Sequence, residues 1–140
     1  MNPEDRDLLL RDLCARIPYG VKFKVTDTST TELSSIGIKW SGSIPVNLFY
    51  KRPQFYLINE FGNQEYKPYL RSLSSMSKEE VKEFYEVEDM DHPVGYIKPQ
   101  PNWHFTIKGI DWLNAHHFDY RGLIEKGLAI EVTKDDNPYE

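Results

Sequence analysis

Short runs of alternating apolar and polar residues fill the stretch from residue 21 to residue 58. The alternation occurs at 21–26, at 36–40 and at 46–50, and a fourth run covers 55–58. Because a strand that buries one face alternates in this way, the pattern predicts four short strands. Turn-forming residues such as Ser41-Gly42-Ser43 separate the runs. Strands joined by tight turns pair as an antiparallel meander or close into a small open barrel.

A helix is predicted on the N-terminal side of these strands, at Pro3–Arg16. Asn2 can cap its first amides, and proline is tolerated at the first helical position. One apolar stripe at helical spacing follows, formed by Leu9, Leu10, Leu13, Cys14 and Ile17. The stripe predicts a buried face that includes Cys14. A sheet with one buried face needs a cover, and this helix is the expected one.

The clearest helix signal in the second half is the capping box Ser77-Lys78-Glu79-Glu80. Its serine can accept from a backbone amide while its last glutamate reaches back, which predicts a helix at 77–87. A shorter helix is predicted at 110–117. Short strands are predicted at 96–97 and 104–107, and a last strand is predicted at 128–132.

These elements together predict one α+β domain over residues 1–140. We expect an N-terminal helix packed on a small antiparallel sheet or open barrel, followed by two further helices and a closing strand. The length suits a single domain with a core of its own. The acidic tail at about 133–140 is expected to fray.

Charge is distributed unevenly along the chain, which carries a formal net charge of −5. The segment 77–91 holds seven acidic and two basic side chains and therefore equals that whole value. The stretch 131–140 is also acidic, so the remaining residues are mildly basic. A domain dedicated to nucleic acid shows a much stronger basic excess. We expect the acids to form a solvated helix face and tail.

Several classes of protein are disfavoured by what the sequence lacks. It contains no apolar run long enough to span a membrane and no opening typical of a signal peptide, so we expect no membrane association. Cys14 is the single cysteine, which predicts a reducing compartment, the cytoplasm. Phosphate-binding loops, dinucleotide fingerprints and zinc motifs are missing, and no cofactor is expected.

One group of residues could hold a divalent metal, namely His104, Asp111, His116 and His117. Imidazoles and carboxylates are common metal ligands, and an open position on the metal would make a hydrolase site. Adjacent histidines point about 100° apart on a helix, unlike a pair spaced four residues apart. A metal-dependent hydrolase is therefore a weaker alternative, and we expect the chain not to be an enzyme.

Two groups of residues are candidates for ligand binding. Bases and aromatic rings are interleaved around residues 50–71, where Lys51, Arg52, Tyr69 and Arg71 could form a platform for single-stranded nucleic acid. The second group is Tyr120 and Arg121, because an arginine can clamp a carboxylate or a phosphate with two hydrogen bonds. The ordinary alternatives are a strand face and a loop tied to a neighbouring carboxylate.

Three stretches carry a resemblance: LLRDLCARIPYGV at 9–21, KPYLRSLSSM at 67–76 and DWLNAHHFDYRGLI at 111–124. Together they resemble a family of uncharacterised proteins of gut anaerobic bacteria, often encoded in prophages and other mobile elements. The resemblance implies an accessory protein of a phage or mobile element and assigns no role to any residue. We therefore expect a non-enzymatic binding or interaction module with a protein partner. Nucleic-acid binding and metal-dependent hydrolysis are the alternatives.

Overall fold

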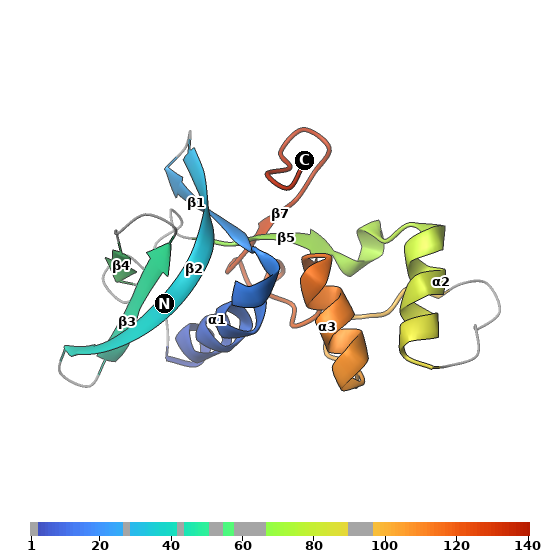
Figure 1. The fold of residues 1–140 in the computed structure, drawn as a ribbon, viewed down its shortest axis with the longest axis horizontal. Coiled ribbons are helices and arrows are strands. Elements are labelled where there is room, and N and C mark those ends of the chain that lie inside the picture. The colour runs from blue at the N-terminus through green and yellow to red at the C-terminus, as the bar shows by residue number, and fades with distance from the viewer. Residues whose placement is uncertain (1–2, 27–28, 42–43, 51–54, 58–66, 90–96) are drawn as a thin grey trace.

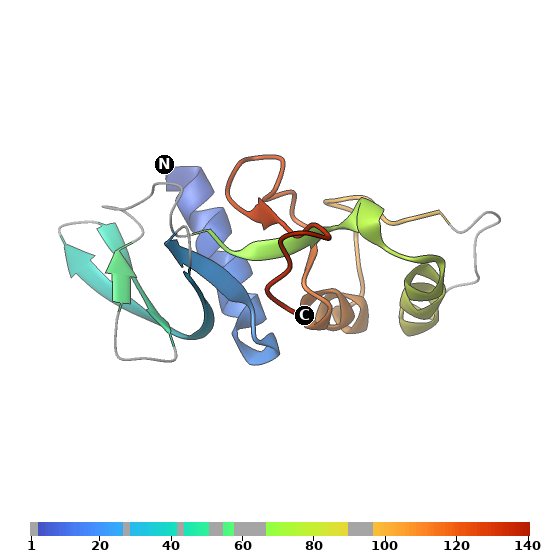
Figure 2. The same ribbon diagram turned by 90° about the horizontal axis from the view of Figure 1, so that it is seen from above.

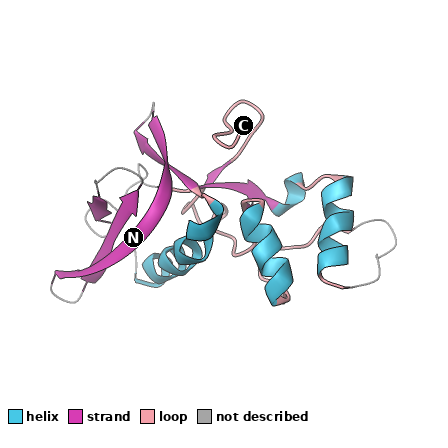
Figure 3. Cartoon of the chain, viewed as in Figure 1, coloured by secondary structure: helices cyan, strands magenta, loops and turns pink. Residues whose placement is uncertain are grey.

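The computed structural model describes residues 3–26, 29–41, 44–50, 55–57, 67–89 and 97–140. The chain begins with helix α1 (Pro3–Arg16) and a 3-10 turn (Ile17–Tyr19), and both bounds of α1 agree with the prediction. Helices α2 (Lys78–Val87) and α3 (Ile107–Ala115) follow later in the chain. Figure 3 shows the helices beside one another, with most of the strand structure toward one end of the molecule.

The first sheet contains β1 (Lys22–Thr26), β2 (Ser29–Ser41), β3 (Ile44–Tyr50) and β4 (Phe55–Leu57). The strands lie in that order, and each neighbouring pair is antiparallel. Helix α1 lies beside this sheet (Figure 1).

The second sheet contains β5 (Tyr69–Ser72), β6 (Phe118–Asp119) and β7 (Ile130–Glu131) in the order β6-β5-β7. Both of its strand pairs are parallel. The predicted fold class, built on an antiparallel sheet, is therefore wrong in its sheet: the chain is α+β, but the small sheet beside α2 and α3 is parallel. The reason lies in the connection from β5 to β6, which runs through α2 and α3. Such a crossover returns the chain to the same end of the sheet, whereas an antiparallel pair needs only a hairpin.

The buried apolar side chains form two clusters. The first joins α1, β1 and the residues around β5 and β7, and its members are Leu9, Leu13, Val21, Phe23, Leu70, Leu123, Leu128 and Ala129. The second lies between α2, α3 and β6, and its members are Leu73, Met76, Val81, Phe84, Tyr85, Trp112, Leu113, Phe118 and Tyr120. Figure 2 shows β5 running between the two groups of elements. The strand contributes Leu70 to the first cluster, and Leu73, the residue that follows it, belongs to the second.

The two later helices are joined at their ends by a buried carboxylate. Helix α2 begins with the predicted capping box, in which Ser77 and Glu80 exchange hydrogen bonds of 3.1 and 3.0 Å. At its other end Glu88 accepts from the backbone amide of Thr106, the N-cap of α3. A carboxylate at a helix N-terminus is favourable. The predicted strand at 104–107 is therefore wrong, because Thr106 caps a helix that starts at Ile107. The predicted strand at 96–97 lies largely outside the described residues.

The C-terminal residues fold back onto the rest of the chain. Tyr139 donates a hydrogen bond to the backbone carbonyl of Tyr69 at 2.7 Å. Thr133 and Asp136 exchange backbone hydrogen bonds in a turn that precedes this contact. The tail at 133–140 thus differs from the frayed segment predicted from its charge. Among the described residues no helix has the length and apolar character needed to cross a membrane.

Candidate binding pocket

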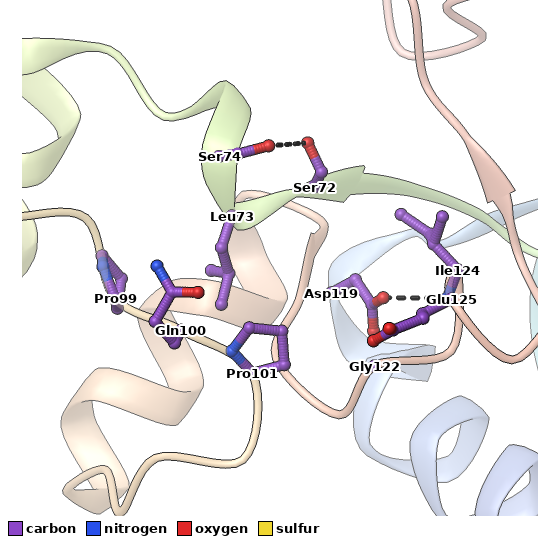
Figure 4. Close-up of a pocket in the computed structure, with 10 residues that line it drawn as sticks. All are labelled: Ser72, Leu73, Ser74, Pro99, Gln100, Pro101, Asp119, Gly122, Ile124 and Glu125. Carbon is purple, nitrogen blue, oxygen red and sulfur yellow. Dashed lines mark hydrogen bonds between the residues drawn. The ribbon is translucent and has the colours of Figure 1, made fainter.

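A pocket of about 300 Å³ lies where three segments of the chain meet (Figure 4). The first segment is the end of β5 with the turn that follows it, the second is residues 99–101, and the third is the loop after β6. The lining residues are Ser72, Leu73, Ser74, Pro99, Gln100, Pro101, Asp119, Gly122, Ile124 and Glu125. Strand pairing brings two of the segments together, because Ser72 lies opposite Asp119 in the parallel register.

Asp119 shapes the loop side of the pocket. One carboxylate oxygen accepts from the amide of Leu123 and the other from the amide of Ile124, both at 2.9 Å. Asp119 is 4% exposed, so these bonds replace the water that burial removes from its carboxylate. Gly122 lies within the loop at a φ of +78°, a conformation that costs glycine little.

Residues 99–101 form the opposite wall and are held at both ends. Before the wall, the Lys98 ammonium donates to the carbonyl of Ser74 at 2.6 Å. After it, the amide of Asn102 donates to the carbonyl of Tyr120 at 2.9 Å. The two prolines limit the backbone between these anchors. The wall is therefore fixed against both β5 and the segment after β6.

The lining combines an apolar surface with negative charge. Leu73, Pro101 and Ile124 supply apolar surface, whereas Asp119 and Glu125 supply carboxylates. No lysine, arginine or histidine is among the lining residues. The hydroxyls of Ser72 and Ser74 lie 3.0 Å apart and bond to each other. Such a pocket favours a ligand that combines an apolar stem with a positive charge or hydrogen-bond donors.

A buried ion pair on α1 contacts β6, the strand that precedes the loop of the pocket. Arg16 and Asp12 on α1 are both fully buried, and the Arg16 Nε atom lies 2.7 Å from the Asp12 carboxylate. Arg16 also donates to the carbonyl of Phe118 at 2.6 Å. Its guanidinium lies 5.1 Å from the centre of the Tyr120 ring.

Tyr120 and Arg121 belong to this ion-pair region and not to the pocket. Tyr120 is 4% exposed, and its hydroxyl has no hydrogen-bond partner among the described residues. The Arg121 Nε atom lies 3.8 Å from the Asp12 carboxylate, and its guanidinium lies over the Tyr120 ring. Arg121 therefore contacts a carboxylate of the same chain, which is the alternative to ligand binding considered in the sequence analysis.

The residues predicted to bind nucleic acid do not form an open platform where they are described. Tyr69 is 3% exposed. Arg71 makes two hydrogen bonds of 2.8 and 2.9 Å to the Glu80 carboxylate and lies over the Phe118 ring. Lys51 and Arg52 lie outside the described residues. The two basic and aromatic groups that can be placed are thus already in contact with partners of the same chain.

The candidate metal ligands are also dispersed. His104 is exposed, and Asp111 lies near Tyr19, where burial and the charge of this carboxylate raise the pKa of the phenol. The His116 ring stacks on Trp112 at 4.1 Å, whereas the His117 ring stacks on Tyr139 at 3.7 Å. In the parts of the chain that the structure describes, no three histidine, cysteine, aspartate or glutamate side chains gather to hold a metal ion.

His117 instead occupies a half-buried position that favours its neutral form. Burial lowers the pKa of this histidine to about 4, and the charge of Arg16 contributes in the same direction. Its Nδ1 atom has no hydrogen-bond partner among the described residues. The backbone of His117 has a φ of +64°, which is uncommon for a residue with a side chain.

The sequence analysis did not identify the pocket, although two signals were present. Pro99-Gln100-Pro101 indicated only a break in the chain, and Asp119 only a turn. What brings them together is the parallel pairing of β5 with β6, which no local pattern reveals. Comparisons of the chain with models of protein families, with functionally characterised proteins and with solved structures found no match.

Proposed function

We propose that the protein is a non-enzymatic binding module whose pocket receives a basic side chain of a partner protein. One observation carries the proposal: the pocket contains two carboxylates and apolar surface but no basic group in its lining. Asp119 is fixed by backbone amides, whereas Glu125 is exposed and can meet an incoming charge. A lysine or arginine has both the apolar stem and the charged end that this lining suits.

The size of the pocket supports a side chain as ligand. Its volume of about 300 Å³ lies at the lower end of the range for small-molecule sites, roughly 300–1,000 Å³. In protein interfaces, anchor residues fill well-packed pockets, and arginine is enriched among these anchors. The lining offers Ser72 and Ser74 as hydroxyl groups, but these bond to each other and no histidine lies beside them to act as a base. The lining therefore favours binding over nucleophilic catalysis.

The setting that we propose follows from the resemblance to proteins of prophages and mobile elements. In that setting the chain would act in the cytoplasm as an accessory protein that binds another protein. The lining of the pocket suits a basic residue of the partner protein that is flanked by apolar atoms.

An array of random hexapeptides tests this proposal. We expect the peptides that bind to be enriched in arginine or lysine. Replacing the basic residue of a selected peptide by citrulline, which keeps the shape of arginine and removes its charge, should weaken binding. Equal affinity of the arginine and citrulline peptides would contradict the proposal.

Matched variants of the protein locate the contact. Glu125→Gln should weaken a selected peptide by roughly two- to fivefold, as expected for one partly exposed ion pair. Glu131→Gln removes an exposed carboxylate outside the pocket and should leave the affinity unchanged. An equal loss in both variants would indicate a general effect of net charge and would exclude the pocket as the site.

A further inference from the structure

The two sheets of the protein approach each other through β1 and β5. Phe23 and Pro68 form an antiparallel bridge, and the amide of Lys24 donates to the carbonyl of Lys67 at 3.0 Å. In this register the next position along places Lys22 opposite Tyr69. A direct hydrogen bond from the Lys22 amide to the Tyr69 carbonyl would continue the ladder.

The hydroxyl of Tyr139 stands between these two backbone groups. It accepts from the Lys22 amide at 2.9 Å and donates to the Tyr69 carbonyl at 2.7 Å. A phenol can accept and donate at once, so it relays the missing ladder bond. Burial raises the pKa of Tyr139, which favours the protonated phenol that donates this bond.

The other contacts of the tail surround the same ring. The ring of His117 lies parallel to the ring of Tyr139, with centroids 3.7 Å apart and planes inclined by 10°. The Lys22 ammonium donates to the carbonyl of Pro138 at 2.7 Å. Asn137 accepts from the amide of Tyr139 at 3.0 Å. We call the site formed by Lys22, Tyr69 and His117 the tyrosine slot.

The slot has the features of a recognition site for a phenol. One side is a flat ring at stacking distance, and the end holds one backbone donor and one backbone acceptor. A phenylalanine would satisfy the stacking but would leave both backbone groups without this partner. Tyr139, which fills the slot, is joined to the rest of the protein through the segment that follows β7. This segment loops out of the sheet and returns (Figure 1).

We propose that the tyrosine slot is a binding site for a tyrosine side chain, which this chain fills with its own Tyr139. The C-terminal segment is then a clasp that can be removed and replaced, and its state decides how firmly the two sheets are joined. A phenol supplied from outside would occupy the slot when Tyr139 is absent. This inference is independent of the acidic pocket and of its ligand.

Two variants of Tyr139 test the clasp. Tyr139→Phe keeps the ring and removes the hydroxyl, and it should lower the midpoint of thermal unfolding by about 3–6 °C. Tyr139→Ala empties the slot and should lower the midpoint by roughly 6–12 °C. Amide hydrogen exchange should become at least about tenfold faster at Lys22 in both variants, while amides of α2 keep their protection.

Small phenols test whether the slot recognises its ligand. p-Cresol has the shape of the tyrosine side chain, and toluene lacks only the hydroxyl. Millimolar p-cresol should raise the unfolding midpoint of Tyr139→Ala and slow exchange at Lys22, whereas toluene should have little effect and the unchanged protein should not respond. If Tyr139→Ala does not fold alone, p-cresol should restore folding and toluene should not.

Three results would overturn the proposal. Equal effects of p-cresol and toluene would mean that the slot is only an apolar cavity. The absence of any effect of p-cresol would mean that Tyr139 does not act as a separable ligand. Unchanged exchange at Lys22 in Tyr139→Phe, a variant that keeps the ring, would mean that the hydroxyl does not join the sheets.

Discussion

The buried ion pair between Asp12 and Arg16 gives the sharpest test of how this protein is stabilised. Both side chains are fully buried, and they lie four residues apart on α1. Asp12→Ala removes the carboxylate that accepts two hydrogen bonds from Arg16, at 2.7 and 3.2 Å. The guanidinium then keeps only the carbonyl of Phe118 and the face of Tyr120 as described partners. Arg121 also loses the carboxylate beside it.

The size of the effect follows from burial. An exposed pair at this spacing contributes about 0.3–0.5 kcal/mol, because water screens both charges. Removing one partner of a buried pair costs about 3–5 kcal/mol, because the other charge stays out of water without compensation. The higher helix propensity of alanine offsets only a few tenths of this cost. For a domain with a total stability of about 5–15 kcal/mol, we expect a loss near 3–5 kcal/mol.

Urea unfolding measures this loss, and α1 offers a matched control. Asp7 and Arg11 have the same spacing on the same helix, but both are exposed. Asp7→Ala should change the free energy of unfolding by less than about 0.5 kcal/mol. The double variant Asp12→Leu with Arg16→Met should recover much of the loss, because no fully buried charge is then left unpaired and Arg121 is partly exposed to water. If Asp12→Ala cost no more than Asp7→Ala, the reasoning from burial would be refuted.

Three further predictions rest on single contacts. Gly109→Ala should destabilise the protein although alanine favours helices, because the new Cβ would overlap the buried Glu88 carboxylate; a thermal midpoint above that of the unchanged protein would show that Glu88 can move away. His117 has a folded pKa of about 4, below its ordinary value, so the unfolded state binds more protons between about pH 6.5 and 4 and stability should fall as the pH is lowered through that window. Asparagine tolerates the same backbone conformation, so His117→Asn should flatten the pH dependence of the free energy of unfolding. The Glu80 carboxyl would have a raised pKa from burial alone, but its bonds to Arg71 and to the helix cap lower the value. Glu80→Gln should therefore lose about 1 kcal/mol at neutral pH, and the loss should disappear as the pH falls through the lowered pKa of this carboxyl in urea titrations.

The helices could be predicted from the sequence because their signals are local. The capping residues of α2 lie within four positions of one another, and the start of α1 is marked by Pro3. The apolar stripe of α1 correctly placed Leu9 and Leu13 in the core, but it did not give the full extent of the buried face. Cys14, placed on the apolar stripe, is exposed, whereas Asp12 and Arg16 are buried. The helix also contacts β6, where Arg16 donates to the carbonyl of Phe118, and Asp12 compensates the buried charge of Arg16 in this contact.

The parallel sheet was missed because each of its strands is short and pairs with distant residues. Strand β5 has four residues, and β6 and β7 have two each. Runs of this length carry few alternating positions, so only β7 was indicated, within the predicted strand at 128–132, and no pattern showed its parallel pairing with β5. Thr106 was an available signal for the start of α3, but its partner Glu88 lies eighteen positions earlier in the chain. The pocket depends on the same long-range pairing, and for that reason none of its residues was predicted as a site.

The charge distribution of the sequence has a different meaning once the contacts are known. The acids of α2 were expected to form a solvated face, yet Glu80 binds Arg71, Glu83 accepts from the Trp112 ring nitrogen and Glu88 caps α3. These acids therefore hold the second half of the protein together. Because part of the charge of both signs is used inside the fold, the net charge of the chain does not identify its partner. A ligand in the pocket would instead meet the local charges of the lining. The carboxylates of Asp119 and Glu125 have no basic neighbour there.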